Sequence, residues 1–265
     1  MILTGFKKFY KQLLFDLNAN SKFYGAIYKI YLKHFYKPSK DSLAVLIDEF
    51  SKKRGKVKFI QIGANDGFYH DPLYKFIKRD AWEGVLLEPQ PYVFETFLKR
   101  LHKNNPAIHL VNAALDYNDG ERKIYRIAFS NSRWATGLST LDKSVLEKVI
   151  ASGHIDRLAK RYGEKIPASI NEYISDEPIN CMSVDTLMSK YSMTQLDWLQ
   201  IDAEGYDYEI IKMFNIEKTQ PSVIAYESSH LSAEDKSACE AYLIKNGYTL
   251  QQIKENTVAQ KNTIQ

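Results

Sequence analysis

The chain has 265 residues, of which 45% are hydrophobic and 26% are charged, so it has enough apolar material for one large folded domain. It contains no run of roughly 18 uncharged apolar residues and does not begin like a secretory signal, which predicts a cytoplasmic protein. Cys181 and Cys239 have no second Cys or His at metal-ligand spacing, so we expect free buried thiols and no disulfide or zinc site.

Residues 1–40 form a basic extension. They carry eight lysines and one aspartate, a net charge of +7, whereas the whole chain has +4 and the remainder therefore −3. A mildly acidic body argues against a nucleic-acid enzyme with a basic stripe across its main domain, because phosphate binding needs Lys and Arg near the site.

Apolar residues in this extension recur at steps of three and four, which predicts two amphipathic helices joined by a turn at residues 18–21. The two apolar faces consist of Leu3, Phe6, Phe9, Tyr10, Leu13, Leu14 and Leu17, and of Phe23, Tyr24, Ile27, Ile30, Tyr31 and Phe35. The pattern fits a helical cap that packs on the core. It equally fits a surface that docks peripherally on the inner face of an anionic membrane or on a polyanionic substrate.

Residues 41–265 alternate between helix-like and strand-like segments, which predicts one α/β domain with a mostly parallel sheet and helices on both faces. The expected helices span residues 42–53, 72–78, 92–102, 184–191, 206–214 and 233–246, and the expected strands span 57–62, 84–88, 108–112, 197–202, 222–226 and a last one from 248. A turn at Asp119-Gly120 predicts a hairpin. Residues 129–180 form an irregular insertion with one helix over 143–162.

The segment FIQIGANDGFYHDP, residues 59–72, is a strand followed by a glycine turn and a helix start. Gly63 and Gly67 allow a tight bend and a close approach of ligand to backbone, and Asp71 before Pro72 is expected to cap the helix. A dinucleotide would need bare amides for its pyrophosphate. Here Asp66 places a carboxylate where the phosphate would lie, so the turn favours S-adenosylmethionine, which is cationic and has no phosphate.

The next two strands add to this nucleoside site. Glu88 ends an apolar strand 21 residues after Gly67, which suits hydrogen bonds to both ribose hydroxyls, although NAD sites use the same device. Asn112 and Ala113 end the third strand, and the small residue leaves room for an adenine. Asn112 fits a structural turn equally well.

The segments FIQIGANDG, VLLEPQP, HLVNAAL with the following DYNDGERKIY, INCMSVDTL and above all LDWLQIDAEGYDYEII resemble the FkbM-type family of S-adenosylmethionine-dependent methyltransferases. The resemblance covers residues 57–248. It implies a class I methyltransferase (Rossmann-like) fold with seven strands, S-adenosylmethionine as methyl donor, and transfer to oxygen, often a sugar or natural-product hydroxyl. Gln61 departs from the acidic residue that many relatives have there. The residues assigned to the donor are Gln61, Gly63, Ala64, Asn65, Asp66, Gly67, Glu88, Pro89, Asn112, Ala113 and Asp202.

Catalytic groups are expected at the end of the central strand. An alcohol needs a positioned base when its oxygen attacks, and the candidates are Asp202, Glu204 and His230. For Glu204 a purely structural place at the start of the next helix is the alternative. Asp202, Glu204 and Glu227 are also possible ligands of a magnesium ion, but their spacing alone assigns no metal.

The insertion is expected to select the acceptor, because loops on a fixed scaffold carry specificity. The residues assigned to acceptor binding are His70, Arg133, Trp134, Ser139 and Thr140, the last two within TGLSTL, which resembles a family loop near the active site. We therefore expect O-methylation of a saccharide or glycan-like acceptor, as in cell-surface polysaccharide synthesis. The alternatives are an RNA methyltransferase that uses the basic extension, an NAD-dependent oxidoreductase and a non-catalytic binding protein. The sequence does not indicate an oligomeric state.

Overall fold

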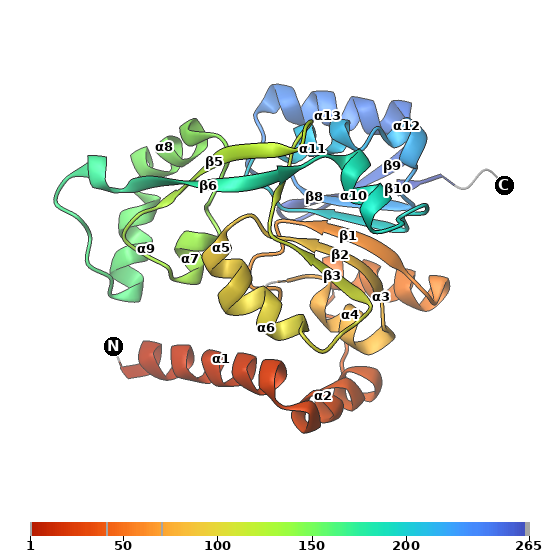
Figure 1. The fold of residues 1–265 in the computed structure, drawn as a ribbon, viewed down its shortest axis with the longest axis horizontal. Coiled ribbons are helices and arrows are strands. Elements are labelled where there is room, and N and C mark those ends of the chain that lie inside the picture. The colour runs from red at the N-terminus through yellow and green to blue at the C-terminus, as the bar shows by residue number, and fades with distance from the viewer. Residues whose placement is uncertain (1, 41, 70, 263–265) are drawn as a thin grey trace.

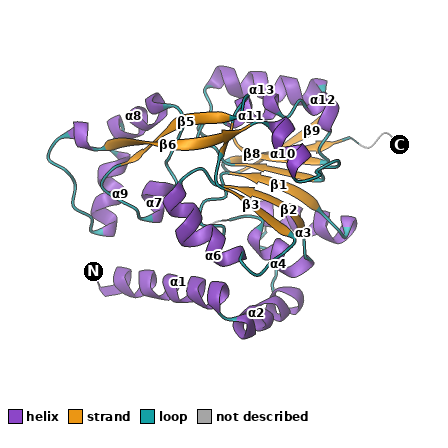
Figure 2. Ribbon diagram, viewed as in Figure 1, coloured by secondary structure: helices purple, strands orange, loops and turns teal. Residues whose placement is uncertain are grey.

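A seven-stranded sheet organises the chain in the computed structural model, which describes residues 2–40, 42–69 and 71–262, with side chains from residue 9 onward (Figures 1 and 2). The strand order is β3-β2-β1-β7-β8-β10-β9, and β10 alone is antiparallel to both neighbours. The strands are β1 (Lys58–Ile62), β2 (Glu83–Leu87), β3 (Ile108–Val111), β7 (Trp198–Ile201), β8 (Val223–Glu227), β9 (Tyr248–Ile253) and β10 (Asn256–Lys261). This confirms the expected class I methyltransferase sheet.

Helices cover both faces of the sheet, as expected. One face carries α3 (Leu43–Arg54), α4 (Tyr74–Asp80) and the segment α5 (Pro91–Val93), η1 (Phe94–Leu98, a π-helix) and α6 (Lys99–His102); the other carries α10 (Val184–Lys190), α11 (Asp207–Met213) and α13 (Ala233–Lys245). A short α12 (Ile216–Thr219) precedes β8. Because successive strand residues point to opposite faces, Ile60 joins the core under α11 while Phe59 joins the core under α3.

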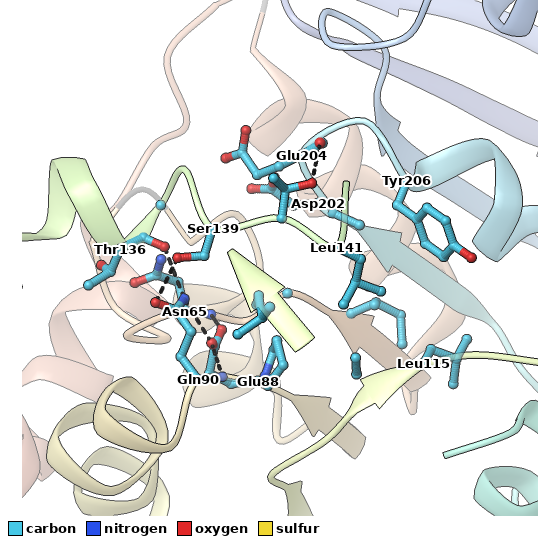
Figure 3. A pocket seen from close by; sticks show the side chains of 18 of the residues that line it. Asn65, Glu88, Gln90, Leu115, Thr136, Ser139, Leu141, Asp202, Glu204 and Tyr206 are labelled. Atoms are coloured by element: carbon cyan, nitrogen blue, oxygen red, sulfur yellow. Dashed lines mark hydrogen bonds between the residues drawn. The ribbon is translucent and has the colours of Figure 1, made fainter. Parts of the chain in front are cut away.

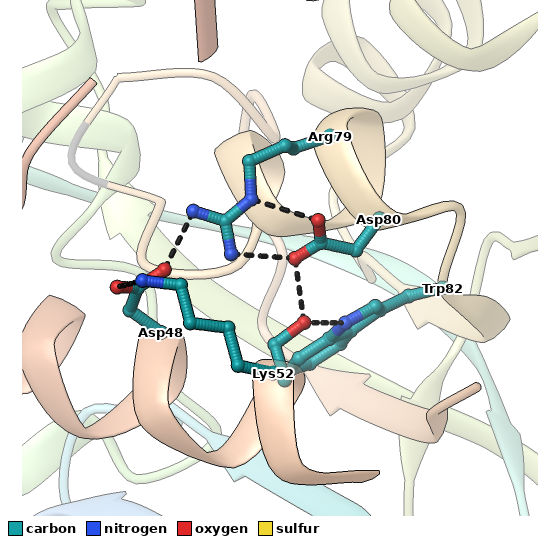
Figure 4. Close-up of polar contacts among 6 residues, drawn as sticks. Asp48, Lys52, Arg79, Asp80 and Trp82 are labelled. Atoms are coloured by element: carbon teal, nitrogen blue, oxygen red, sulfur yellow. Dashed lines mark hydrogen bonds and ion pairs between the residues drawn. The ribbon is translucent and has the colours of Figure 1, made fainter. Parts of the chain in front are cut away.

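A polar network fixes α3 against α4 beside the start of β2 (Figure 4). Arg79 forms ion pairs with Asp48 at 2.6 Å and with Asp80 at 2.7 Å. Ser51 Oγ donates to Asp80 at 2.5 Å and accepts from the buried indole of Trp82 at 2.9 Å. Buried charges are stable when they are paired and hydrogen-bonded, so this network holds α4 in place behind the β1–α4 turn.

A second sheet extends from the first, and it corrects the predicted hairpin (Figure 2). Its strands are β4 (Ala114–Leu115), β5 (Gly120–Ile127) and β6 (Ile174–Met182), in the order β4-β6-β5. Ala114 and Gly120 both pair with Cys181, so β6 lies between the two strands that were expected to pair. The turn at Asp119-Gly120 does reverse the chain, but a strand about 60 residues later supplies the hydrogen bonds.

The insertion differs from its prediction in one further respect. The expected helix over 143–162 is two helices, α8 (Lys143–Ala151) and α9 (His154–Tyr162), because Gly153 adopts φ 69° between them. A left-handed residue ends an α-helix. The other helices here are α7 (Arg133–Thr136) and the 3-10 turn η2 (Ile170–Glu172), and together they cover one end of the second sheet.

The basic extension forms α1 (Ile2–Asn20) and α2 (Lys22–His34), which lie along α6 and α4 at the lower edge of Figure 1. Ser21 caps α2 by accepting the Tyr24 amide at 3.1 Å, at the predicted turn. Among the described side chains, none of the predicted apolar faces is buried: the buried apolar residues of the two helices are Phe15, Ala19 and Leu32. The side chains of Leu3 and Phe6 lie outside the described part. Of the helices described, none is both long and apolar enough to cross a membrane.

Candidate active site

The turn after β1 brings bare backbone against the end of β7. Gly63 has φ 74°, and a Cβ there would come within 1.9 Å of the Asp202 carbonyl oxygen. Any other residue would push the two strand ends apart. Beyond it, Asp71 accepts the amides of Leu73 at 2.8 Å and Tyr74 at 2.6 Å, so it caps α4 as predicted.

Glu88 organises the same corner from the end of β2. Its carboxylate accepts the Asn65 amide at 2.8 Å, and the Gln90 amide and side-chain nitrogen at 2.9 and 3.1 Å (Figure 3). Burial raises the pKa of Glu88 to about 7, and these hydrogen bonds oppose the rise. A carboxylate has about four acceptor positions, so roughly one remains for a ligand in the cavity. We call Gly63, Asn65, Glu88 and Gln90 the amide wall.

The cavity lies at the carboxyl ends of β1, β2 and β7, where open α/β sheets bind ligands. Six of the residues assigned to the donor line it, namely Gly63, Asn65, Glu88, Pro89, Ala113 and Asp202. Sequence reasoning missed Gln90, Thr136 and Tyr206, which also line it. All three fall within segments that carry the family resemblance, but their side-chain roles depend on contacts between segments.

Two polar residues assigned to the donor have structural roles instead. Gln61 shares its strand face with Phe59, under α3 and α4, and donates to Asp71 at 2.9 Å. Asp66 accepts the amides of Phe68 and Tyr69 at 2.9 Å and forms an ion pair with Arg133. Neither lines the cavity, so the prediction that they contact the ligand is not supported.

Three more of these residues shape the cavity from outside it. Asn112 donates to the carbonyl oxygens of Glu88 at 2.8 Å and Pro89 at 3.1 Å, which is the structural role considered for it. The Ala64 amide extends the β1–β2 ladder, and the Gly67 amide closes the turn onto Ala64. A Cβ at Gly67 would meet Leu98 at 2.6 Å, so glycine is needed there for packing.

The loop over residues 133–141 closes the cavity and joins its two sides. Ser139 Oγ donates to Gln90 at 2.9 Å, and Thr140 Oγ1 donates to the Glu204 carbonyl at 3.3 Å (Figure 3). Gln90 in turn donates to the Thr136 carbonyl at 3.0 Å. Arg133, Ser139 and Thr140 all line the cavity, so three of the residues assigned to the acceptor lie beside those assigned to the donor.

The other two residues assigned to the acceptor do not join this group. Trp134 is absent from the cavity lining: it stacks on Tyr162 with ring centroids 6.5 Å apart and donates to Glu164 at 3.3 Å. Adjacent residues of a helix point in different directions. Because Arg133 points to the cavity, Trp134 points away from it and packs within the insertion. His70 lies outside the described residues.

Opposite the amide wall, the ends of β7 and β8, the loops after them and the start of α11 carry five ionisable residues that we call the acidic wall: Asp202, Glu204, Asp207, Glu227 and His230. Solvent reaches Asp202 through the cavity, yet the surrounding protein desolvates it. This desolvation and the charges of Glu204, Glu227 and Asp207 raise the pKa of Asp202 well above its usual value. Burial likewise raises the pKa of Asp207 to about 7.

His230 pairs with Glu204 at this wall. Its Nδ1 lies 2.7 Å from Glu204 Oε2, and this hydrogen bond raises the pKa of His230 to about 9. Burial raises the pKa of Glu204, and the bond to His230 opposes that rise. His230 does not itself line the cavity, whereas Glu204, held at φ 50°, does.

The set of possible metal ligands at this wall differs from the magnesium ligands considered from the sequence. Glu204, Glu227 and His230 offer ligand atoms that all lie within 4.8 Å of one another, and Asp202 is not in this group. The histidine is held by a carboxylate and is cationic at neutral pH, which disfavours its use as a ligand because ligands must be deprotonated.

The sheet order, the glycine turn and the cavity at the strand ends define the fold of a class I methyltransferase. The model of the methyltransferase FkbM domain matches residues 61–250, so the chain belongs to the FkbM methyltransferase family. S-adenosylmethionine is therefore its methyl donor, as predicted, and the alternative of an NAD-dependent oxidoreductase is not supported. No curated protein matches this sequence.

The chain is also similar to several solved structures, including the following three. The methyltransferase FkbM from Methylobacillus flagellatus KT has 14% identity and a TM-score of 0.45 over 88% of this chain, and this chain covers 47% of its length. The N-terminal domain of human METTL16 in complex with SAH has 13% identity and a TM-score of 0.40, covering 86% and 73% of the two chains. Precorrin-6y C5,15-methyltransferase from Geobacter metallireducens GS-15 has 13% identity and a TM-score of 0.39, covering 86% and 94%.

Proposed function

We propose that the chain is an O-methyltransferase that acts on a hydroxyl group of a saccharide or glycan-like acceptor. The observation that supports this most is a single cavity with a nucleoside-type corner at Glu88 on one side and carboxyl groups at Asp202 and Glu204 on the other. S-adenosylmethionine supplies the activated methyl group when bound. The protein contributes the placement of the acceptor and a base for its proton.

The residues fit this donor on chemical grounds. Glu88 offers an acceptor to ribose hydroxyls, and the absence of a side chain at Gly63 leaves backbone next to the ligand. Ala113 is small enough for a flat base beside it. The carboxyl groups of the acidic wall suit the positive charge of the donor and disfavour a diphosphate.

We assign the base to Asp202. A carboxylate whose pKa is raised by its neighbours is a stronger base than an exposed aspartate, and catalysis by proton transfer is most efficient when this pKa approaches the working pH. The acceptor oxygen would bond to the methyl carbon as the bond from that carbon to the sulfonium sulfur breaks, leaving S-adenosylhomocysteine, while the acceptor's proton passes to Asp202. His230 is protonated at neutral pH, so its role is to hold Glu204 and not to accept the proton.

The acceptor would lie under the loop of residues 133–141. Arg133 and Ser139 line the cavity with a guanidinium and a hydroxyl group, which can bind sugar hydroxyls or an acidic substituent, while Thr140 ties the loop to Glu204. Holding both reactants in one cavity can itself account for much of a rate enhancement.

Two measurements test the proposal. Calorimetric titration with S-adenosylhomocysteine and NAD should give heat with the first alone. A screen of sugar nucleotides, oligosaccharides and total RNA with labelled donor should then place the label on a saccharide hydroxyl. Label on RNA, together with RNA binding that is salt-sensitive and requires residues 1–40, would support the nucleic-acid alternative and contradict the saccharide acceptor.

A further inference from the structure

The outer face of α1 and α2 carries a concentration of exposed apolar side chains. It includes Phe9, Leu13, Phe23, Ile27, Ile30 and Phe35, whose exposed fractions run from 42% for Leu13 to 78% for Phe23. Tyr10 and Tyr31 are exposed on the same two helices, and the other exposed large apolar side chains of the described chain lie singly on separate elements. Contiguous exposed apolar surface marks an interaction site, whereas isolated residues do not.

Helix geometry explains why this face points outward. Leu13 lies about 200° around α1 from the buried Phe15, and Phe23 lies about two and a half turns along α2 from the buried Leu32. Each exposed residue is therefore on the side of its helix opposite the buried one. Because α1 packs on α6 and α2 packs on α4 (Figure 1), the opposite side of each helix, with its exposed apolar side chains, faces solvent.

A row of lysines runs along one flank of the α2 stripe. Lys22, Lys29 and Lys33 are seven and four residues apart, which places them on a common side of the helix next to Ile30. Within the part of the chain that the structure describes, no carboxylate forms an ion pair with them. Asp16, the acidic residue of α1, is 2.9 Å from Arg100 and is therefore already paired.

The local charge is thus positive and uncompensated. The pKa of Lys78 on the neighbouring α4 is lowered mainly by burial and secondly by the positive charge of Lys29. A second copy of the chain on this face would bring two such lysine rows together, because a two-fold interface pairs a patch with itself. A nucleic acid would satisfy the lysines but would leave the phenylalanine and isoleucine side chains in water.

We propose that the outer face of α1 and α2 binds the surface of a bilayer that contains anionic lipids. An interfacial helix inserts its apolar stripe at the boundary between headgroups and acyl chains while flanking lysines contact anionic headgroups. This docking holds the catalytic domain at a lipid surface. It is independent of the acceptor proposed above.

The test is flotation of the full chain with vesicles of phosphatidylcholine alone and with added phosphatidylserine. The wild-type chain should float with the anionic vesicles and dissociate at high salt. The double variant Ile27→Glu/Ile30→Glu should lose at least tenfold in vesicle affinity. The matched control Ile170→Glu/Ile244→Glu, which changes two isoleucines of similar exposure elsewhere, should bind as the wild type does.

A second variant separates charge from apolar insertion. Lys22→Gln/Lys29→Gln/Lys33→Gln should lose about fivefold in affinity per lysine, whereas Lys53→Gln/Lys56→Gln/Lys218→Gln removes the same charge from other exposed positions and should not. Circular dichroism and binding of S-adenosylhomocysteine verify that each variant is folded.

Three results would overturn the proposal. The first is wild-type protein that stays with the unbound fraction, and the second is equal flotation of the Ile27→Glu/Ile30→Glu variant and its control. The third is a dimer in sedimentation equilibrium that this variant converts to a monomer, which would assign the face to a second copy of the chain.

Discussion

The amide wall and the acidic wall of the cavity stabilise their carboxyl groups by different means. On the amide wall, three N–H groups from Asn65 and Gln90 surround Glu88. On the acidic wall, four carboxyl groups lie close together. Among the described residues, His230 alone forms an ion pair with one of them, Glu204. The carboxylate of the first wall is largely satisfied by the protein, with roughly one acceptor position left for a ligand, whereas the second wall favours a ligand that brings positive charge.

This difference has a physical consequence. Amides that are fixed by the backbone cost nothing to reorganise when a ligand arrives, so the amide wall should determine affinity. Clustered carboxyl groups raise one another's pKa values and become more basic, so the acidic wall should determine the rate of proton transfer and the dependence on pH. The following predictions test that division.

The largest effect is expected where the two walls meet. Gly63→Ala places a Cβ within 1.9 Å of the Asp202 carbonyl, and we expect more than about 4 kcal/mol of destabilisation together with loss of binding to S-adenosylhomocysteine. Urea denaturation and calorimetry measure the two effects. Gly163→Ala is the control, because it has a similar φ of 69° with open space around it, and it should cost only about 1–2 kcal/mol.

Asp202→Asn should separate rate from affinity. It removes the base and retains the size of the side chain, so kcat should fall about 100- to 10,000-fold while the affinity for S-adenosylhomocysteine changes little. Single-turnover kinetics with an identified acceptor measures the first quantity and calorimetry the second. An unchanged kcat would assign the base elsewhere, with Glu204 as the next candidate.

Glu88→Ala should do the reverse. Loss of hydrogen bonds to a charged group is expected to weaken binding of S-adenosylhomocysteine about 10- to 100-fold, with Glu88→Gln in between because the amide oxygen still accepts. Glu83→Ala, at the exposed start of the same strand, should bind as the wild type does. Similar heats for Glu83→Ala and Glu88→Ala would contradict the assignment of Glu88 to the donor.

A dependence of stability on pH is expected from a single carboxyl group of the acidic wall. The folded pKa of Asp207 is about 7, above its ordinary value of 3.8, so the stability that it contributes is fully present below about pH 4 and is lost as the pH rises through 7. Asp207→Asn should therefore gain up to a few kcal/mol relative to the wild type between pH 5 and pH 8 in urea denaturation. Glu88 shifts in the same direction, so the variant should remove only part of the slope. Parallel pH curves would contradict an ionisable Asp207.

Agreement between sequence and structure is best where a few neighbouring residues decide the geometry. The bend at Gly63, the cap at Asp71 and the place of Glu88 at a strand end depend on conformations within one short segment. The C-terminal β9–β10 turn was missed because Lys254 takes φ 56° there, at a residue type that carries no turn signal.

The sequence by itself determined the sheet with helices on both faces, the corner that we propose for the methyl donor and the family, because these follow from periodicity, turn chemistry and motifs within short segments. Tertiary structure decided that β6 separates β4 from β5, that Gln90 joins Glu88 to the loop over the cavity, and which side of α1 and α2 faces solvent. Each of these is a competition between distant segments for the same hydrogen bonds or the same buried surface. Its outcome depends on the free energies of both partners, which local sequence does not contain.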